Sequence, residues 1–318
     1  VGGVVGGHKA ASPEVKSCYN AGAVVDTAGN SNNIDAIVGA SRGTNTDCYF
    51  ISGCGSSTKS GVTEGSSLTA AELGDAFKAD TDGLNGGLPV LTWQERKPDL
   101  IIGSYEAFKA FADSVNNGNS YEGKLVRLAC NVFLGGKSAP WSPIGSSSAS
   151  FKGVFDGGYH VVSGLYISSG SGIGLFGDVN GGEIRNLVVR GEVSGSSNAA
   201  GIVGKLTAGK VTNCGNEADV SGGSCVGGVV GYVNGDCTVS GCYNRGAVSG
   251  TTGYIGGVTG QHWRAGVVED CYNAGTVSGP ATVGGVVGGH KAASPVLTRC
   301  LGAGTVVDTA GNSNNIDA

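Results

Sequence analysis

Short apolar segments bounded by glycine recur along the chain at a nearly constant spacing. A four-residue motif, Gly-Xaa-Xaa-Gly, recurs at steps of 27, 27, 29 and 28 residues. Its copies begin at Gly174, Gly201, Gly228, Gly257 and Gly285. Two further columns keep the same spacing: Leu187, Cys214, Cys242, Cys271, Cys300, and Val193, Val220, Val248, Val277, Val306. Periods of 20–50 residues are typical of solenoids and repeat arrays.

The segments that carry these columns predict strands. Residues 246–250 and 275–279 are short, β-branched and bounded by glycine, which is typical of strands joined by tight turns. The sequence therefore predicts an all-β fold, a right-handed parallel β-helix (β-solenoid) with rungs of about 27–29 residues. Like residues would stack on like at the strand spacing of about 4.8 Å. Glycines would supply the positive φ angles at the corners.

A second, longer repeat is nested around the first. Residues 1–36 match residues 283–318 at a constant offset of 282, with 29 of 36 positions identical. We therefore expect tandem units of about 282 residues in a longer polypeptide. Residues 1–97 would form the C-terminal part of one solenoid unit, with its closing helix and strand. Residues 98–318 would form the N-terminal cap and rungs of the next unit.

Short helices are predicted where the strand pattern stops. Thr69 and Glu72 match a capping box, and Leu68 with Leu73 matches a hydrophobic staple. The predicted helix runs to about Ala79, and residues 88–94 read as a closing strand. Residues 95–99, charged and Pro-containing, read as the linker between solenoids.

A second capping helix is predicted at the start of the next unit. Ser104 can cap a helix that runs to about Val115, with Phe108, Ala112 and Val115 on one face. A helix across the end of a solenoid would shield unpaired strand edges from other chains.

Composition narrows the classes of function. The chain has 61 glycines among 318 residues, yet 40% of residues are apolar and only 14% are charged, with a net charge of −5. No cluster of Lys and Arg could neutralise a run of phosphates, so we expect no nucleic-acid partner. No apolar run approaches the roughly 18 residues of a membrane span. The chain begins with Val1 and has no Met, so we expect an internal piece of a longer polypeptide.

The column Cys214, Cys242, Cys271 and Cys300 predicts a structural ladder. Cysteine behaves as a small buried hydrophobe, and stacked rungs would separate Cβ atoms by about 4.8 Å, against the roughly 3.8 Å of a disulfide. We therefore expect most of these thiols to be free and buried. Two other pairs lie near turns and could bridge in an oxidising compartment: Cys225 with Cys237, or Cys48 with Cys54.

Catalytic chemistry finds little support in the sequence. Polysaccharide lyases and hydrolases with this fold need clustered carboxylates on one face. Asp156, Asp178 and Glu183 lie in neighbouring rungs but beside glycine, which favours roles in turns. His8 and His290 occupy the same position in the two copies of the long repeat, where we expect a solvated loop. The HExxH and P-loop signatures are absent, and we expect no catalytic site, metal or cofactor.

Three aromatic residues offer a binding hypothesis. Tyr232, Tyr254 and Trp263 flank the glycine motif in adjacent rungs. A row of rings on one face could stack on sugars, or the rings could merely cover the solenoid. Both interpretations remain open at this stage.

Several motifs together resemble those of the GLUG-motif repeat proteins. They include residues 141–145, 151–157, 164–167 and 174–177, and the repeated Cys-Tyr-Asn at 242–244 and 271–273. Residues 88–94 are similar to the strand that closes such units. Later rungs depart from the pattern, with Val or Ile in place of Phe. GLUG repeats occur in large bacterial surface proteins, in adhesin-like proteins and in non-catalytic parts of IgA-specific metallopeptidases. The resemblance carries no catalytic residue.

The resemblance and the tandem repeat together lead to one expectation. The chain is expected to be a structural or adhesive segment of a long bacterial extracellular protein, at the cell surface or secreted. Its expected partners are other copies of the unit, end to end in a covalent array or filament. Two alternatives remain: an adhesin module for host or matrix glycans or host protein, and a polysaccharide-degrading β-helix enzyme.

Overall fold

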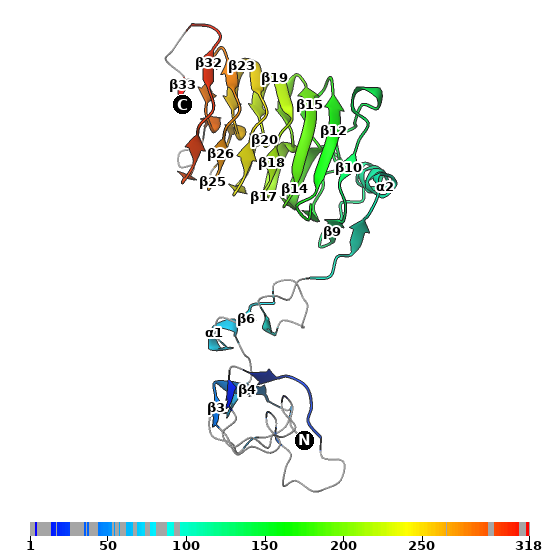
Figure 1. Cartoon of the computed structure of the whole chain (residues 1–318), viewed down its shortest axis with the longest axis vertical. Coiled ribbons are helices and arrows are strands. Elements are labelled where there is room, and N and C mark those ends of the chain that lie inside the picture. Colours follow the sequence, from blue (N-terminus) through cyan, green and yellow to red (C-terminus); the bar gives the residue numbers. More distant parts are fainter. Residues whose placement is uncertain are drawn as a thin grey trace. The chain divides into compact units, whose positions relative to one another are not determined.

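The structure, a computed structural model, divides into two compact units, residues 1–97 and 98–318 (Figure 1). Each unit is described by itself. The described residues are 4, 14–16, 18–25, 35, 37, 44–52, 54, 57, 62–65, 69–73, 77–80, 88–91, 96–264, 266–291, 296–311 and 316–317. The boundary falls within the charged segment 95–99, and the tandem arrangement of units stays a prediction.

Unit 98–318 is built on two large sheets whose strands pair in parallel. The first sheet contains β10 (Val132–Phe133), β12 (Val161–Ile167), β13 (Ser171–Ile173), β15 (Val188–Ser194), β16 (Ser197–Ala200), β18 (Gly215–Asn216), β19 (Asp219–Gly227), β22 (Tyr243–Asn244), β23 (Val248–Gly256), β26 (Tyr272–Asn273), β27 (Val277–Gly279), β28 (Val283–Gly284), β31 (Leu301–Gly302), β32 (Val306–Asp308) and β33 (Ile316–Asp317). The second contains β8 (Leu100–Ile102), β9 (Leu125–Leu128), β11 (Val154–Asp156), β14 (Phe176–Arg185), β17 (Val203–Thr212), β20 (Val230–Val233), β21 (Thr238–Ser240), β24 (Thr259–His262), β25 (Val267–Glu269), β29 (Val287–His290) and β30 (Val296–Thr298).

The strand register reproduces the period of the sequence. Val193 pairs with Val220, Val220 with Val248, Val248 with Val277, and Val277 with Val306. The first four of these valines, Val193, Val220, Val248 and Val277, are at most 1% exposed. The predicted fold, a parallel β-solenoid in which like residues stack on like, is confirmed.

The motif glycines have a different role from the one expected. Gly201, Gly228 and Gly257 do not have positive φ angles. A Cβ atom at Gly201 would lie 1.8 Å from Oδ1 of Asn216, and one at Gly228 would lie 2.3 Å from Oδ1 of Asn244. The expectation of positive φ angles is therefore wrong for these three glycines, although it holds at other glycines such as Gly158, Gly164 and Gly241. They are needed because a stacked asparagine fills the space where a side chain would lie.

Many corners instead use residues other than glycine. The residue before each ladder position has a left-handed conformation, with φ of 53° at Asn213, 61° at Gly241, 54° at Asp270 and 51° at Arg299. Asn and Asp tolerate this region better than most L-residues. The corner that precedes the cysteine ladder is therefore set by backbone geometry with little requirement for glycine.

Helix α2 (Tyr105–Asn116) closes one end of the unit (Figure 1). Ser104 caps the helix by accepting a hydrogen bond from the amide of Ala107 at 3.2 Å, as expected. The apolar face is buried and includes Phe108, Phe111, Ala112 and Val115. A short 3₁₀ helix, Gly136–Ser138, follows β10. The predicted capping helix at this end is confirmed.

Unit 1–97 has a smaller described core that holds Val15, Ile37, Cys48 and Phe50. Its parallel strands are β1 (Glu14–Lys16), β2 (Tyr19–Asn20), β3 (Thr44–Thr46), β4 (Cys48–Ile51) and β5 (Val62–Gly65). Cys18 and Cys48 lie in adjacent rungs at the same position, as predicted for the cysteine ladder. The amide of Tyr49 donates to the carbonyl of Cys18 at 2.8 Å, as the amide of Tyr243 does to the carbonyl of Cys214.

The predicted helix up to Ala79 is wrong. Helix α1 spans Ala70–Leu73, and Phe77–Lys78 is strand β6, which pairs antiparallel with β7 (Val90–Leu91). The aromatic Phe77 packs edge-on against Tyr19 at 5.6 Å between ring centroids, so tertiary contact outweighs helix propensity there. The capping partners Leu68 and the Glu72 side chain lie outside the described residues.

Candidate functional site

The cysteine ladder lies inside one corner of the solenoid. Cys214, Cys242 and Cys271 are at most 2% exposed, and Cys300 is half-buried. Each thiol donates to the carbonyl two residues earlier, at 3.1–3.3 Å. Burial raises the pKa of Cys242 far above its usual range. All ten cysteines are free in the structure, so the ladder is arranged for packing.

A second, fully buried column consists of Asn216, Asn244 and Asn273. Asn216 Nδ2 donates to Asn244 Oδ1, and Asn244 Nδ2 donates to Asn273 Oδ1, both at 2.7 Å. Each Nδ2 also donates to the carbonyl two residues later at 2.8 Å. Because buried amides cost free energy unless paired, this continuous chain of bonds fixes the rungs in register.

The carboxylates considered for catalysis are held in ion pairs. Asp156 Oδ2 lies 3.1 Å from Arg127 and 3.3 Å from Arg185, and its Oδ1 accepts from the amide of Gly158 and from Asn186. Burial tends to raise the pKa of Asp156, but these donors and charges outweigh it and lower the pKa. Asp156 thus keeps the expected role in a turn.

Asp178 does not lie in a turn, where the sequence predicted it. It lies within strand β14, with its side chain 6% exposed, and its Oδ2 lies 3.2 Å from Lys205 Nζ. Glu183, on the same strand, pairs with Arg185 at 3.5 Å. The structure therefore does not bring the three carboxylates together as one free acidic cluster.

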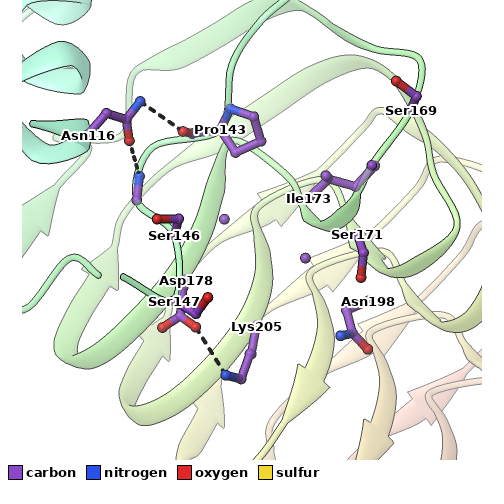
Figure 2. A pocket seen from close by; sticks show the side chains of 14 residues that line it. Asn116, Pro143, Ser146, Ser147, Ser169, Ser171, Ile173, Asp178, Asn198 and Lys205 are labelled. Carbon is purple, nitrogen blue, oxygen red and sulfur yellow. Dashed lines mark hydrogen bonds and ion pairs between the residues drawn. The ribbon is translucent and has the colours of Figure 1, made fainter. Parts of the chain in front are cut away.

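The Asp178–Lys205 pair forms the floor of a pocket of about 600 Å³ (Figure 2). The lining has hydroxyl groups from loop residues Ser146, Ser147 and Ser169 and from Ser171 on β13, and side-chain amides from Asn116 on α2 and Asn198 on β16. Asn116, at the end of α2, holds the rim by donating to the carbonyl of Pro143 at 3.1 Å and accepting from the amide of Gly145 at 2.7 Å. The lining residues are Asn116, Pro143, Gly145, Ser146, Ser147, Ser169, Gly170, Ser171, Gly172, Ile173, Gly177, Asp178, Asn198 and Lys205.

The chemistry of this pocket favours hydrogen bonding over catalysis. Asp178 is the one carboxylate among the described lining residues, whereas glycoside hydrolysis uses two. Ser171 hydroxyl lies 2.7 Å from that of Ser197, and Asn198 has a left-handed φ of 51°. Sequence reasoning missed the pocket. The signal that could have found it is the pair of serine-rich runs at 146–150 and 168–171, which lie outside the repeat columns.

Two of the three predicted aromatic residues share a partner. Lys291 Nζ lies 4.6 Å from the ring centroid of Trp263 and 5.8 Å from that of Tyr254. Trp263 is 42% exposed. The hydroxyl of Tyr232, on the neighbouring strand β20, lies 3.3 Å from Asn234 Oδ1. The exposed Trp263 and Lys291 present a surface on which a planar or sugar ring could stack.

A further aromatic pair went unnoticed in the sequence. Tyr243 and Tyr272 are stacked with ring centroids 5.4 Å apart and planes at 11°. Arg245 lies over Tyr243 at 5.0 Å, and Glu217 accepts from the Tyr243 hydroxyl at 3.2 Å. The Cys-Tyr-Asn repeat is the signal that places these rings at one rung position.

Two histidines are neighbours across adjacent strands. His262, on β24, is 1% exposed and pairs in register with His290 on β29. Burial, with a contribution from His290, lowers the pKa of His262 to about 4. His290 ends a strand and is exposed, which corrects the loop interpretation. His8, its repeat counterpart, lies outside the described residues.

The described residues show neither a metal-binding cluster nor a membrane-spanning helix. None of their His, Cys, Asp and Glu side chains form a group of three or more suited to hold a metal ion. Within the same part of the chain, helices long and apolar enough to cross a membrane are absent.

Comparison with known proteins gives one structural similarity. No family model matches the sequence, and no curated protein matches it. The chain is similar to the crystal structure of a "putative immunoglobulin A1 protease" from Bacteroides ovatus, with a TM-score of 0.53 and 21% identity. The match covers 67% of this chain and 68% of that chain. At this identity the similarity supports the solenoid fold.

Proposed function

We propose that this chain is a structural repeat segment of a long bacterial extracellular protein, at the cell surface or secreted, of the kind that GLUG-motif proteins exemplify. Units stacked end to end would form a rod or filament. The observation that carries the proposal is the repeat of residues 1–36 at 283–318, within a fold whose buried side chains serve the stacking of rungs.

The buried polar groups support a structural role. The asparagines donate to the next asparagine of the column and to backbone carbonyls of their own rung. The cysteines donate to backbone carbonyls of the neighbouring rung. Asp156 and Asp178 are engaged with Arg and Lys. Since these groups act on the fold itself, the proposal assigns no catalytic residue to the chain.

A glycan-binding module is the second candidate function. Two observations favour it: the hydroxyl-lined pocket above Asp178 and Lys205, and the exposed Trp263 beside Lys291. Sugar recognition commonly combines hydrogen-bonding groups with a ring that stacks on the sugar. Under this alternative the rod would present these surfaces to host or matrix glycans.

Imaging of the full chain tests the leading proposal. We expect negative-stain electron microscopy to show rods whose length grows with protein concentration, and light scattering to show a matching rise in mass. A strictly monomeric particle at high concentration would contradict self-assembly.

A glycan array with the full chain tests the alternative. Retained glycans that are lost with Trp263→Ala or with Ser171→Ala would support it. Phe133→Ala is the matched control, because Phe133 is 65% exposed and lies outside both surfaces.

A further inference from the structure

The pocket above Asp178 and Lys205 lies beside a backbone position that recurs in successive rungs. The strands that contain this position pair in register, so its copies form one column along the solenoid. Every residue of the column has a left-handed φ, between 51° and 65°. The column consists of Gly172, Asn198, Cys225, Tyr254 and Thr282. The backbone conformation is therefore the same in each of these rungs, and only the side chains differ.

The size of the side chain in this column decides where space remains. Cys225 is 8% exposed, and its thiol donates to Oε1 of Gln261 in the next rung at 3.2 Å. At Gly172, by contrast, no atom outside its chain neighbours lies within 4 Å of the place that a Cβ atom would take. The pocket is lined by Gly172 and Asn198 but not by Cys225 or Tyr254. It is therefore the stretch of the column that the sequence leaves unfilled.

The floor of the pocket combines two opposite charges. Asp178 and Lys205 pair in register on strands β14 and β17, and their side chains are 6% and 29% exposed. No other described lining residue is charged, so a charged ligand would be attracted by one of the two groups and repelled by the other. A Lys ammonium has three donors and a carboxylate has two acceptor oxygens. The ion pair between Lys205 Nζ and Asp178 Oδ2 therefore leaves both groups with further hydrogen-bonding capacity.

The sides of the pocket add neutral groups that both donate and accept hydrogen bonds. Figure 2 shows Ser171 and Asn198 across the pocket from Ser146. Pockets for drug-like ligands are lined mostly by hydrophobic and aromatic side chains, whereas the described lining here has no aromatic residue, and its larger apolar side chains are those of Pro143 and Ile173. Since each hydroxyl of a sugar also donates and accepts, the pocket matches an uncharged ligand with many hydroxyl groups.

We propose that this pocket binds one uncharged sugar residue at the end of a glycan chain. Lys205 donates to one sugar hydroxyl and Asp178 accepts from a neighbouring one, while the serine and asparagine side chains bond to the others. A terminal residue fits because the pocket is bounded along the solenoid by the loop that Asn116 holds and by the filled column at Cys225. This inference rests on the glycan-binding candidate function, and it assigns that function one site and one class of ligand.

Saturation-transfer difference NMR with the full chain provides the direct test. The uncharged probes are the methyl glycosides of glucose, galactose, mannose, fucose and N-acetylglucosamine. The acidic probes are those of glucuronic acid and N-acetylneuraminic acid. We expect saturable binding of at least one uncharged glycoside and at least tenfold weaker binding of both acidic ones. On a glycan array, the full chain should retain glycans that end in the sugar that binds.

Gly172→Tyr fills the pocket while the rest of its lining stays in place. The substitution copies Tyr254, which has a φ of 61° at the same position of the column, against 65° at Gly172. We expect the glycoside to bind at least tenfold more weakly with an unchanged unfolding transition. Ser146→Ala combined with Ser171→Ala is the second variant should Gly172→Tyr alter folding, and it should weaken binding at least fivefold because it removes a hydroxyl from each side.

Gly181→Tyr is the matched control. Gly181 also has a left-handed φ, of 93°, and an open space where a Cβ atom would lie, but it does not line the pocket. It is exposed on the same strand as Asp178. Glycoside binding should be unchanged by this substitution.

Four outcomes would contradict the inference in different ways. Equal binding to Gly172→Tyr and to the parent chain would overturn the site, and tighter binding of the acidic glycosides would overturn the class of ligand. Array binding that is lost with Trp263→Ala but kept with Gly172→Tyr would support glycan binding at the other surface and overturn this pocket as the site. An array on which the full chain retains no glycan would contradict the candidate function itself, and the pocket with it.

Discussion

The described residues at the two ends of unit 98–318 differ in how much of their apolar surface is buried. At the end that carries α2, Phe111 stacks on Phe155 with ring centroids 5.5 Å apart and contacts Phe151 edge-on with centroids 5.8 Å apart. All three residues are at most 2% exposed. At the other end, Leu297 and Leu301 are more than half exposed. The end that carries α2 is therefore closed by a helix and aromatic rings, whereas the described rungs farthest from α2 have exposed leucines.

This difference shows what a stack of rungs requires. Each rung buries its apolar face against its neighbours, so the terminal rungs need something else to cover them. At the closed end a capped helix and bulky aromatic rings fill the wider core. Away from that end the core consists of columns of Val, Cys and Asn. The core of the unit therefore has a polarity, from bulky aromatic rings under the helix to small side chains that repeat from rung to rung.

The largest expected effect is at the closed end. Phe111→Ala should reduce the free energy of unfolding by about 3–5 kcal/mol, because it removes a buried ring and leaves a cavity under the helix. Chemical denaturation monitored by circular dichroism measures the change. Phe133→Ala, at an exposed ring, should change it by less than about 0.5 kcal/mol. A small loss at Phe111 would show that the helix does not stabilise the stack.

The second effect depends on pH and lies at His262, on strand β24. The folded state keeps His262 neutral, with its pKa lowered from 6.5 to about 4 by burial. The unfolded chain therefore binds a proton at higher pH than the folded chain, and stability falls as pH drops from about 6.5 to about 4. The loss should reach about 3 kcal/mol.

Comparison with a variant isolates this contribution. In His262→Leu, the loss of stability over that pH range should be smaller by the same amount, while losses due to carboxylates such as Asp156 remain. Denaturant midpoints measured at pH 7, 5.5 and 4 give the comparison. Identical pH profiles for the two proteins would contradict the buried, neutral histidine.

The third effect tests the asparagine column, Asn216, Asn244 and Asn273, which links three rungs of the unit. Asn244→Ala breaks the bonds with Asn216 and Asn273, and it should cost about 2 kcal/mol because buried amide groups lose partners. Asn180→Ala, at an exposed position on β14, is the control. Equal stability of the two variants would mean that the asparagines do not fix the rungs.

Much of the fold could be predicted from the sequence because each rung repeats the same requirements. The valine, cysteine and asparagine columns depend on position within a rung, and period alone reveals them. The cap at Ser104 follows from local rules of helix capping. The role of the motif glycines could not be predicted, because it depends on the asparagine of another strand reaching the space beside them.

The candidate site was less visible for a related reason. The pocket above Asp178 and Lys205 forms where two loops and the end of α2 meet, and none of these follows the repeat. Helix α1 ends early because Phe77 joins a strand against a distant segment. Where contacts are long-range and occur only once, sequence periodicity carries no information about them.

The smallest expected effect is at Leu297 and completes the contrast with Phe111. Leu297→Ala should change the free energy of unfolding of the chain by less than about 0.5 kcal/mol, because a side chain 55% exposed gives up little burial. Chemical denaturation of the two proteins, monitored by circular dichroism as for Phe111→Ala, measures this difference. A loss at Leu297 as large as the loss at Phe111 would contradict the contrast, because it would mean that the leucine contributes as much packing as a ring buried under the helix.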